Sequence, residues 1–175
     1  MGGQLHLCCG DKVLPPPWVN ADARPGPGVD LLVNLHDPWQ LPTSAYSWVY
    51  CSHAIEHLHP DRLHLALLKL RNSLEPGGRL TLATISLEGI YRNAFERGYP
   101  RKAVNAYLYG DAGSADNPLQ AHRQVFTEAW LTESLREAGF SAVRPWALSQ
   151  YPEIAKLNDC AGSSYHVTLY LEGVR

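Results

Sequence analysis

Short apolar runs separated by glycine and proline make up the first half of the chain, a pattern typical of parallel strands that are buried on both faces. We predict strands from these runs at residues 4–8, 18–21, 29–34 and 46–52. Between residues 61 and 74 the leucines instead recur every three or four positions, which predicts an amphipathic helix. Pro60 suits the first turn of this helix, and Pro76-Gly77-Gly78 ends it.

The second half of the chain continues the alternation of strands and helices. Further strands are predicted at residues 79–85, 141–147 and 165–172. Thr127 can cap a helix, and Gly139 near the end of that helix can adopt the left-handed conformation while Phe140 packs back. Strands that alternate with helices and end in a late pair predict an α/β fold, namely a Rossmann-like, mostly parallel sheet with an antiparallel last strand.

The length of 175 residues, with 45% of them hydrophobic, fits one domain spanning residues 1–175. We predict a lid-like insertion at about residues 87–124, where helical stretches are interrupted by glycine and proline. The connections at 9–17 and 22–28 are too rich in these residues for helices, so helices should be reduced on one face of the sheet. We expect the insertion or a second subunit of a homo-oligomer to cover the apolar side chains of that face.

Composition narrows the possible partners. The formal net charge of −2 and the scattered basic residues leave no basic face, so no nucleic-acid partner is expected. There is neither a leader-like N-terminus nor an apolar stretch approaching the roughly 20 residues of a membrane span. We therefore expect a soluble cytoplasmic protein with no membrane partner. Its four cysteines, of which Cys8 and Cys9 are adjacent, are expected to be reduced.

The first two predicted strands have the arrangement that a nucleoside cofactor requires. The stretch LHLCCGD at 5–11 supplies a strand followed by a tight turn, and the next strand ends at Asp22. Backbone amides can approach a ligand at such a turn, and a carboxylate at the second strand end can accept hydrogen bonds from two ribose hydroxyls.

Two later stretches are individually distinctive: SHAIEHL at 52–58, directly after a predicted strand, and Pro76-Gly77-Gly78 within EPGGRL at 75–80. With the glycine turn, the acidic strand end and LREAGF at 135–140, they occur in the order found in one family. The chain resembles the class I S-adenosylmethionine-dependent methyltransferases, specifically a small type 11-like group with an SHxxEHL motif. The resemblance implies S-adenosyl-L-methionine as the cofactor and methyl transfer to an acceptor, which we expect to be a small molecule.

The resemblance also implies which residues bind the cofactor. The methionine part would be wrapped by the first turn, the ribose held by the acidic residue, the adenine placed after the third strand and the pocket lined after the fourth. In that order, the cofactor-binding residues are Cys8, Cys9, Gly10, Asp22, Asn34, Leu35, Ser52 and His53. Cys8 stands where glycine is usual, and Asn34 where aspartate is frequent. These departures keep a second hypothesis open, a non-catalytic binding or partner subunit with the methyltransferase fold.

His53 and His57 are the candidate catalytic bases, since residues four apart on a helical turn point the same way. The alternative is that either histidine packs within the helix start. The segment also fits the H-x-x-E-H pattern of inverted zinc peptidases. In that alternative the protein would be a zinc hydrolase that uses His53, Glu56 and His57. That motif needs a longer helix and a third ligand, so we expect no metal.

The predicted insertion is rich in aromatic and basic side chains that could grip an acceptor with an aromatic or anionic part. The alternative is that these tyrosines only pack the insertion against the body of the domain. The residues concerned are Tyr91, Arg92, Tyr99, Arg101, Tyr107, Tyr109, His122 and Arg123.

Overall fold

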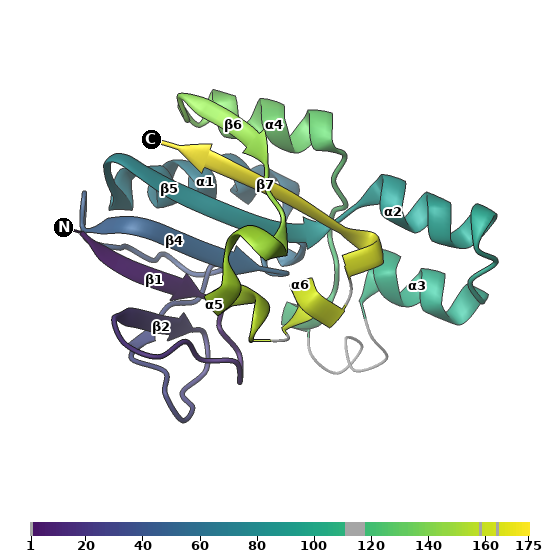
Figure 1. Cartoon of the computed structure of the whole chain (residues 1–175), viewed down its shortest axis with the longest axis horizontal. Helices are drawn as coiled ribbons and strands as arrows, with labels where there is room; N and C mark the ends of the chain where they lie inside the picture. The colour runs from purple at the N-terminus through teal and green to yellow at the C-terminus, as the bar shows by residue number, and fades with distance from the viewer. Residues whose placement is uncertain (1, 111–117, 158, 164) are drawn as a thin grey trace.

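The computed structural model describes residues 2–110, 118–157, 159–163 and 165–175. A seven-stranded sheet in the order β3-β2-β1-β4-β5-β7-β6 forms its centre (Figure 1). The strands are β1 (Gly3–Leu7), β2 (Trp18–Asp22), β3 (Leu31–Leu32), β4 (Tyr46–Ser52), β5 (Leu74–Ile85), β6 (Ala142–Pro145) and β7 (Thr168–Val174). The first five strands pair in parallel, and β7 is antiparallel to both β5 and β6. The predicted fold class is confirmed.

Two helices, α1 (Pro60–Ser73) and α4 (Glu128–Glu137), cover one face of this sheet (Figure 1). The leucine side chains of α1 that gave the helical spacing are buried in the main hydrophobic core. The Thr127 hydroxyl accepts a hydrogen bond from the Trp130 amide at the start of α4, and Gly139 after its end has φ of +89°. The predicted cap and the predicted left-handed glycine are therefore confirmed.

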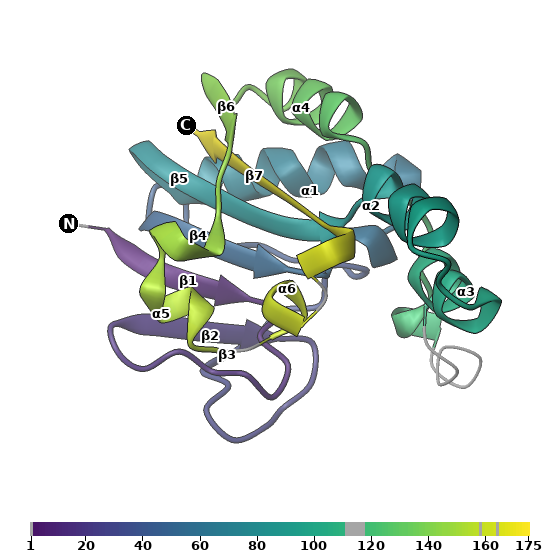
Figure 2. The ribbon, with the colours of Figure 1, turned by 45° about the vertical axis from the view of Figure 1, so that its right-hand side comes forward.

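The opposite face is covered by the chain between β6 and β7, which contains η5 (Leu148–Gln150), α5 (Pro152–Ala155) and α6 (Cys160–Ser163) (Figure 2). Trp48 and Tyr50 of β4 pack there with Trp146 and Ile154 in a second hydrophobic cluster. The expectation that the insertion or a second subunit would cover this face was wrong. The reason is that a single short segment, rich in aromatic residues, supplies enough apolar surface to replace the missing crossover helices.

Specific hydrogen bonds fix this covering segment to the sheet. The Trp146 indole donates to the Leu82 carbonyl oxygen at 3.0 Å. The Tyr50 hydroxyl donates to the Asp159 carboxylate at 2.6 Å, and both side chains are buried. Because buried polar groups without partners are costly, these contacts define one position for the segment.

The segment from β5 to α4 contains α2 (Leu87–Tyr91), the π-helical turn η2 (Arg92–Glu96), α3 (Arg101–Tyr109) and η4 (Pro118–Gln120). It extends beyond the carboxyl ends of the parallel strands (Figure 1). The chain then returns to the sheet through a parallel bridge between Ser86 and Phe126. None of the helices in the described part of the chain combines the length and the apolar character that a membrane span needs.

The largest differences from the predicted strand bounds are in β3, β5 and β7. β3 keeps only two of the six predicted residues, because the Asn34 side chain forms a turn directly after it. β5 begins five residues early, at Leu74, so the Pro76-Gly77-Gly78 stretch lies within it. β7 begins at Thr168 because residues Tyr165–Val167 form a turn of 3-10 helix.

Candidate functional site

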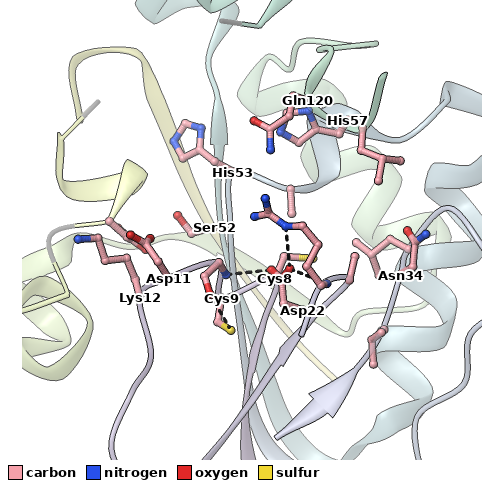
Figure 3. A pocket seen from close by; sticks show the side chains of 18 of the residues that line it. Cys8, Cys9, Asp11, Lys12, Asp22, Asn34, Ser52, His53, His57 and Gln120 are labelled. Carbon is pink, nitrogen blue, oxygen red and sulfur yellow. Dashed lines mark hydrogen bonds and ion pairs between the residues drawn. The ribbon is translucent and has the colours of Figure 1, made fainter. Parts of the chain in front are cut away.

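A crevice of about 520 Å³ opens at the carboxyl ends of β1, β2 and β4, a size typical of small-molecule sites. Figure 3 shows Asp11 and Lys12 at one end of it, Asn34 at the other, and Asp22 between them. Every residue predicted to bind the cofactor, and both candidate bases, line this crevice: Cys8, Cys9, Gly10, Asp22, Asn34, Leu35, Ser52, His53 and His57. The topology thus brings together residues that are up to 49 positions apart in the sequence (57 − 8).

The turn after β1 is left-handed at two positions, Cys8 with φ of +56° and Gly10 with φ of +58°. The Cys9 amide donates to the Ala21 carbonyl oxygen at 3.0 Å, which joins this turn to β2. A Cβ placed on Gly10 would meet no protein atom within 4 Å. The backbone at Gly10 therefore borders open space in the crevice, as close approach by a ligand requires.

The Asp22 carboxylate is fixed at the crevice wall by two backbone amides. Oδ2 accepts from the Gly10 amide at 2.9 Å, and Oδ1 accepts from the Arg24 amide at 3.0 Å. The Arg24 Nε atom lies 3.7 Å from Oδ1. Because each carboxylate oxygen can accept more than one hydrogen bond, the side chain can still receive two hydroxyl groups.

The thiols of Cys8 and Cys9 in this turn both have raised pKa values. A hydrogen bond with Cys51, together with burial, raises the pKa of Cys8 well above its ordinary value. Burial and the Asp22 charge raise the pKa of Cys9 to about 11. Since the thiolate is the nucleophile and the metal ligand, these side chains serve as small packing groups.

Asn34 and Leu35 lie after β3, as expected for residues beside an adenine, but the Asn34 amide is already engaged. Its nitrogen donates to the Asp37 carboxylate at 2.7 Å, and its oxygen accepts from the His36 amide at 3.0 Å. The side chain shapes the turn instead of presenting an unpaired amide to the crevice. Leu35 is buried and offers an apolar contact.

His53 does not share a helix face with His57. It has φ of +45° directly after β4, and the 3-10 turn η1 (Ile55–His57) begins only two residues later. Its Nδ1 lies 2.9 Å from Glu56 Oε1, and its Nε2 lies 3.0 Å from the Thr168 hydroxyl. Both ring nitrogens thus have protein partners, and the helical arrangement expected for an H-x-x-E-H zinc peptidase is not formed.

Glu56 is a fully buried carboxylate at the base of this arrangement. Oε2 accepts a hydrogen bond from the Thr84 hydroxyl at 2.8 Å. Burial acts to raise the pKa of Glu56, but the charge and hydrogen bond of His53 outweigh it and hold the pKa at about 2. Glu56 is therefore ionised.

His57 points instead towards His122 of the segment after α3, with 4.9 Å between the ring centroids. The His57 Nδ1 lies 3.2 Å from the Ala121 carbonyl oxygen. Burial, assisted by His122, lowers the pKa of His57, although the Glu56 charge acts in the opposite direction. Of the aromatic and basic residues noted in the insertion, Tyr107 and His122 line the crevice, whereas Tyr91 and Tyr109 are exposed.

Sequence reasoning missed several residues of the crevice wall, among them His6, Lys12, Arg24 and Asp159. His6 is buried and stacks on Tyr50, with 5.1 Å between the ring centroids. Burial lowers its pKa to about 4. The sequence signal that could have identified His6 is its position within an apolar strand, because a polar residue buried there must find a partner. Nothing local to Asp159 indicates that it reaches the end of β1.

Comparison with known structures identifies the architecture. A structure of an S-adenosylmethionine-dependent methyltransferase from Mesorhizobium loti superposes with a TM-score of 0.59 and 18% identity, over 99% of this chain and 92% of that one. A methyltransferase from Archaeoglobus fulgidus gives a TM-score of 0.60 and 14% identity, over 99% and 86%. The chain has the fold of the S-adenosylmethionine-dependent methyltransferases.

A more distant methyltransferase shares this fold with its cofactor bound. Phosphoethanolamine N-methyltransferase 2 of Haemonchus contortus, in complex with S-adenosyl-L-methionine, gives a TM-score of 0.56 and 9% identity over 100% of this chain and 49% of that one. No protein-family model matches the sequence, and no curated protein does. At these identities the likeness concerns the fold.

Proposed function

We propose that this protein binds S-adenosyl-L-methionine and transfers its methyl group to a small-molecule acceptor. The observation that carries the proposal is the Asp22 carboxylate, held at the wall of the crevice by the Gly10 amide at 2.9 Å. The turn and the acidic residue thereby form one unit at the carboxyl ends of β1 and β2, where this architecture binds nucleosides. The fold supports the same conclusion.

The residues of the crevice fit such a cofactor. The open space above Gly10 accommodates a group in close contact with the backbone, and Asp22 can accept from a ribose diol. Leu35 supplies an apolar contact for a purine, and the Arg24 side chain, 65% exposed, can lie over the same region. Ser52 and His53 close the crevice at the end of β4.

When bound, the cofactor supplies a methyl group already activated by its positive sulfur. The chain therefore has mainly to orient the acceptor in line with that methyl and to exclude water. Residues Tyr107, Leu119 and Gln120, from the segment beyond the strand ends, line the crevice together with Ala106. They leave room for a small acceptor and make the crevice wall partly apolar.

An acceptor that loses a proton needs a base, and the two candidates differ in their geometry. His57 keeps Nε2 without a hydrogen-bond partner in the described part of the chain, since its Nδ1 faces the Ala121 carbonyl. His53 has both nitrogens engaged, by Glu56 and Thr168. We therefore assign the proton-accepting role to His57 and a positioning role to His53.

Isothermal titration calorimetry of the full chain with S-adenosylhomocysteine tests the proposal. We expect binding at one site per chain, with a dissociation constant well below 1 mM. Absence of binding at about 1 mM ligand, by a chain whose circular dichroism shows a folded domain, would overturn it. Binding that is followed by no methyl transfer to any compound of an acceptor panel would favour the non-catalytic hypothesis.

A further inference from the structure

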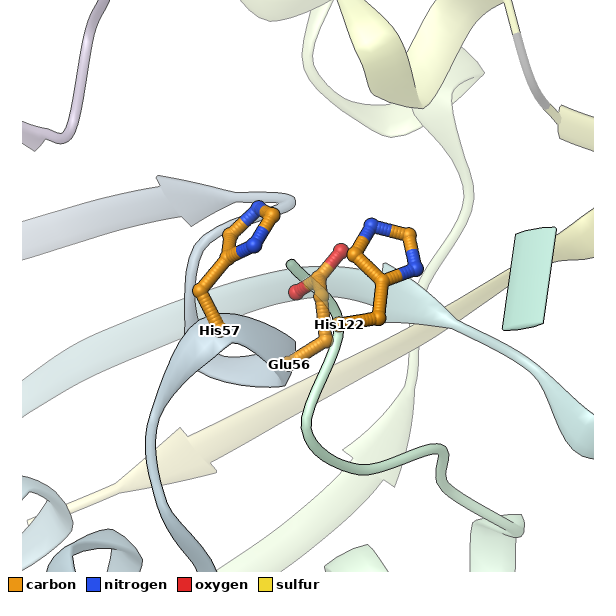
Figure 4. Close-up of side chains that lie close together, drawn as sticks. All are labelled: Glu56, His57 and His122. Carbon is orange, nitrogen blue, oxygen red and sulfur yellow. The ribbon is translucent and has the colours of Figure 1, made fainter. Parts of the chain in front are cut away.

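Beside the proposed acceptor region, three side chains converge from two distant segments of the chain. Glu56 and His57 belong to η1, and His122 follows α3. One carboxylate oxygen and one nitrogen from each imidazole lie within 4.8 Å of one another. Figure 4 shows the Glu56 carboxylate between the two rings. Both histidines line the crevice, so the cluster is accessible from it.

The hydrogen bonds of the two imidazoles point to a ligand. The His57 Nδ1 lies 3.2 Å from the Ala121 carbonyl oxygen, and the His122 Nδ1 lies 2.8 Å from the Tyr107 carbonyl oxygen. A carbonyl oxygen only accepts, so in both rings Nδ1 carries the hydrogen and Nε2 keeps the lone pair. This is the arrangement found in metal-binding histidines, whose other nitrogen donates to a backbone carbonyl or a carboxylate.

The carboxylate is supported in the same way. Oε1 of Glu56 lies 2.9 Å from His53 Nδ1, and Oε2 accepts from the Thr84 hydroxyl. Each oxygen keeps a further lone pair. The two imidazole rings meet edge to face beside a fully buried carboxylate. Together the three side chains form a negatively charged set of nitrogen and oxygen donors.

The positions of the three groups are fixed before any ion binds, because the two segments are hydrogen-bonded to each other. The Arg123 amide donates to the Glu56 carbonyl oxygen at 2.8 Å. The Gln124 side-chain nitrogen donates to the carbonyl oxygens of Ile55 and Leu58, at 3.1 and 3.0 Å. His122 is thereby held next to η1, so little conformational freedom is lost when an ion is bound.

We propose that Glu56, His57 and His122 form a binding site for a divalent first-row transition metal ion, such as Zn²⁺. Two imidazoles and one carboxylate favour such an ion over Mg²⁺ or Ca²⁺, which prefer oxygen ligands. Both histidines line the crevice, so a further ligand could reach the ion from there, as in metal sites that bind an exchangeable ligand. The site differs from the zinc motif considered in the sequence, because His122 replaces His53 as a ligand.

This proposal does not depend on cofactor binding, since the cluster does not include the turn after β1 or Asp22. It does conflict with the proton-accepting role given to His57 above. With an ion bound, His57 Nε2 is a ligand and not a base, so the metal and proton-accepting roles of His57 exclude each other. The ion would also join the segment after α3 to the body of the domain through His122.

Metal titration of the full chain, purified and stripped with a chelator, tests the site. Zn²⁺ binding is measured by calorimetry, and Co²⁺ binding by visible absorption, which distinguishes nitrogen and oxygen ligands from thiolates. We expect one equivalent of either ion in the wild type and at least about 10-fold weaker binding in His122→Ala. His64→Ala is the matched control, because this exposed histidine of α1 lies outside the cluster, and it should bind as the wild type does.

Glu56→Gln serves as a second variant, and circular dichroism of each variant verifies its fold. No stoichiometric binding by the wild type would overturn the proposal, as would equal affinity in His122→Ala or a thiolate charge-transfer band with Co²⁺. S-adenosylhomocysteine is titrated into the same metal-free samples. Cofactor binding without metal binding therefore refutes only the metal site, and metal binding without cofactor binding refutes only the proposed function.

Discussion

Replacement of Asp22 tests the contact on which the proposed function depends. The carboxylate is buried, with its side chain 11% exposed, and each oxygen is oriented by a backbone amide. If it accepts the hydroxyl groups of a ribose, Asp22→Ala removes charge-assisted hydrogen bonds and leaves the hydroxyls without an acceptor. We expect a loss of about 1–3 kcal/mol of binding free energy, roughly a 5- to 150-fold increase in Kd for S-adenosylhomocysteine.

The same substitution also releases the amides of Gly10 and Arg24, so stability has to be measured separately from affinity. Guanidinium denaturation should show a loss of about 1–2 kcal/mol, because two partly buried amides lose their acceptor. Asp22→Asn keeps one oxygen but directs an NH₂ group at one of these amides, so its affinity should lie between wild type and Asp22→Ala.

Asp30→Asn is the control. Asp30 accepts from the Asn20 amide at 2.8 Å near the same edge of the sheet, but it does not line the crevice. Its Kd by calorimetry at 25 °C should match that of the wild type. An unchanged Kd in a folded Asp22→Ala protein, or an equal loss in Asp30→Asn, would refute the assignment of Asp22 to the ribose.

Three further predictions concern the crevice and its support. Gly10→Ala should weaken binding of S-adenosylhomocysteine by at least about 10-fold in calorimetry, because the added Cβ enters the open space of the crevice. The positive φ at this position should cost only about 1–2 kcal/mol of unfolding free energy. Equal affinity would contradict a close approach of the ligand to the Gly10 backbone. Tyr50→Phe should lower the unfolding free energy by about 1–3 kcal/mol in guanidinium, because it leaves the buried Oδ2 atom of Asp159 without its donor, and an unchanged value would contradict this. Burial holds the pKa of His6 at about 4, below the ordinary 6.5. Between these pH values the unfolded chain binds a proton that the folded chain does not. The unfolding free energy should therefore fall by up to about 3 kcal/mol as the pH drops from 6.5 to 4. Denaturation across this pH range should show a flatter dependence for His6→Phe, and an unchanged slope would contradict the assignment.

The sequence predicted the elements that are determined by neighbouring residues. The bounds of β4 match the predicted strand, in which a continuous apolar run from Trp48 to Cys51 ends at a polar residue, Ser52. The cap of α4 was predictable because one side chain, that of Thr127, bonds an amide three residues later. The position of Asp22 could be inferred because a strand end and a preceding turn are both visible in the sequence.

Contacts between distant segments could not be predicted in this way. His122 and Glu56 are brought together by hydrogen bonds between η1 and residues 121–124, and no spacing in the sequence expresses that pairing. Trp146 and Ile154 lie in the segment between β6 and β7. Their packing against the sheet face opposite α1 and α4 depends on which face this segment crosses, and the sequence does not express that choice. The helical spacing inferred for His53 failed because a left-handed residue precedes the short turn η1.

Two adjacent parallel strands, β1 and β4, are each followed by a residue with left-handed backbone conformation, and both of these residues line the site. Cys8 after β1 and His53 after β4 both have positive φ without being glycine, and such residues persist only where surrounding contacts compensate for the strain. The Cys9 amide bonds Ala21, and the His53 amide bonds Ala83 at 2.8 Å, so each conformation is held by the neighbouring strand. Because both turns redirect the chain at the same edge of the sheet, the crevice that contains Asp22 is a consequence of backbone geometry already fixed in the sheet.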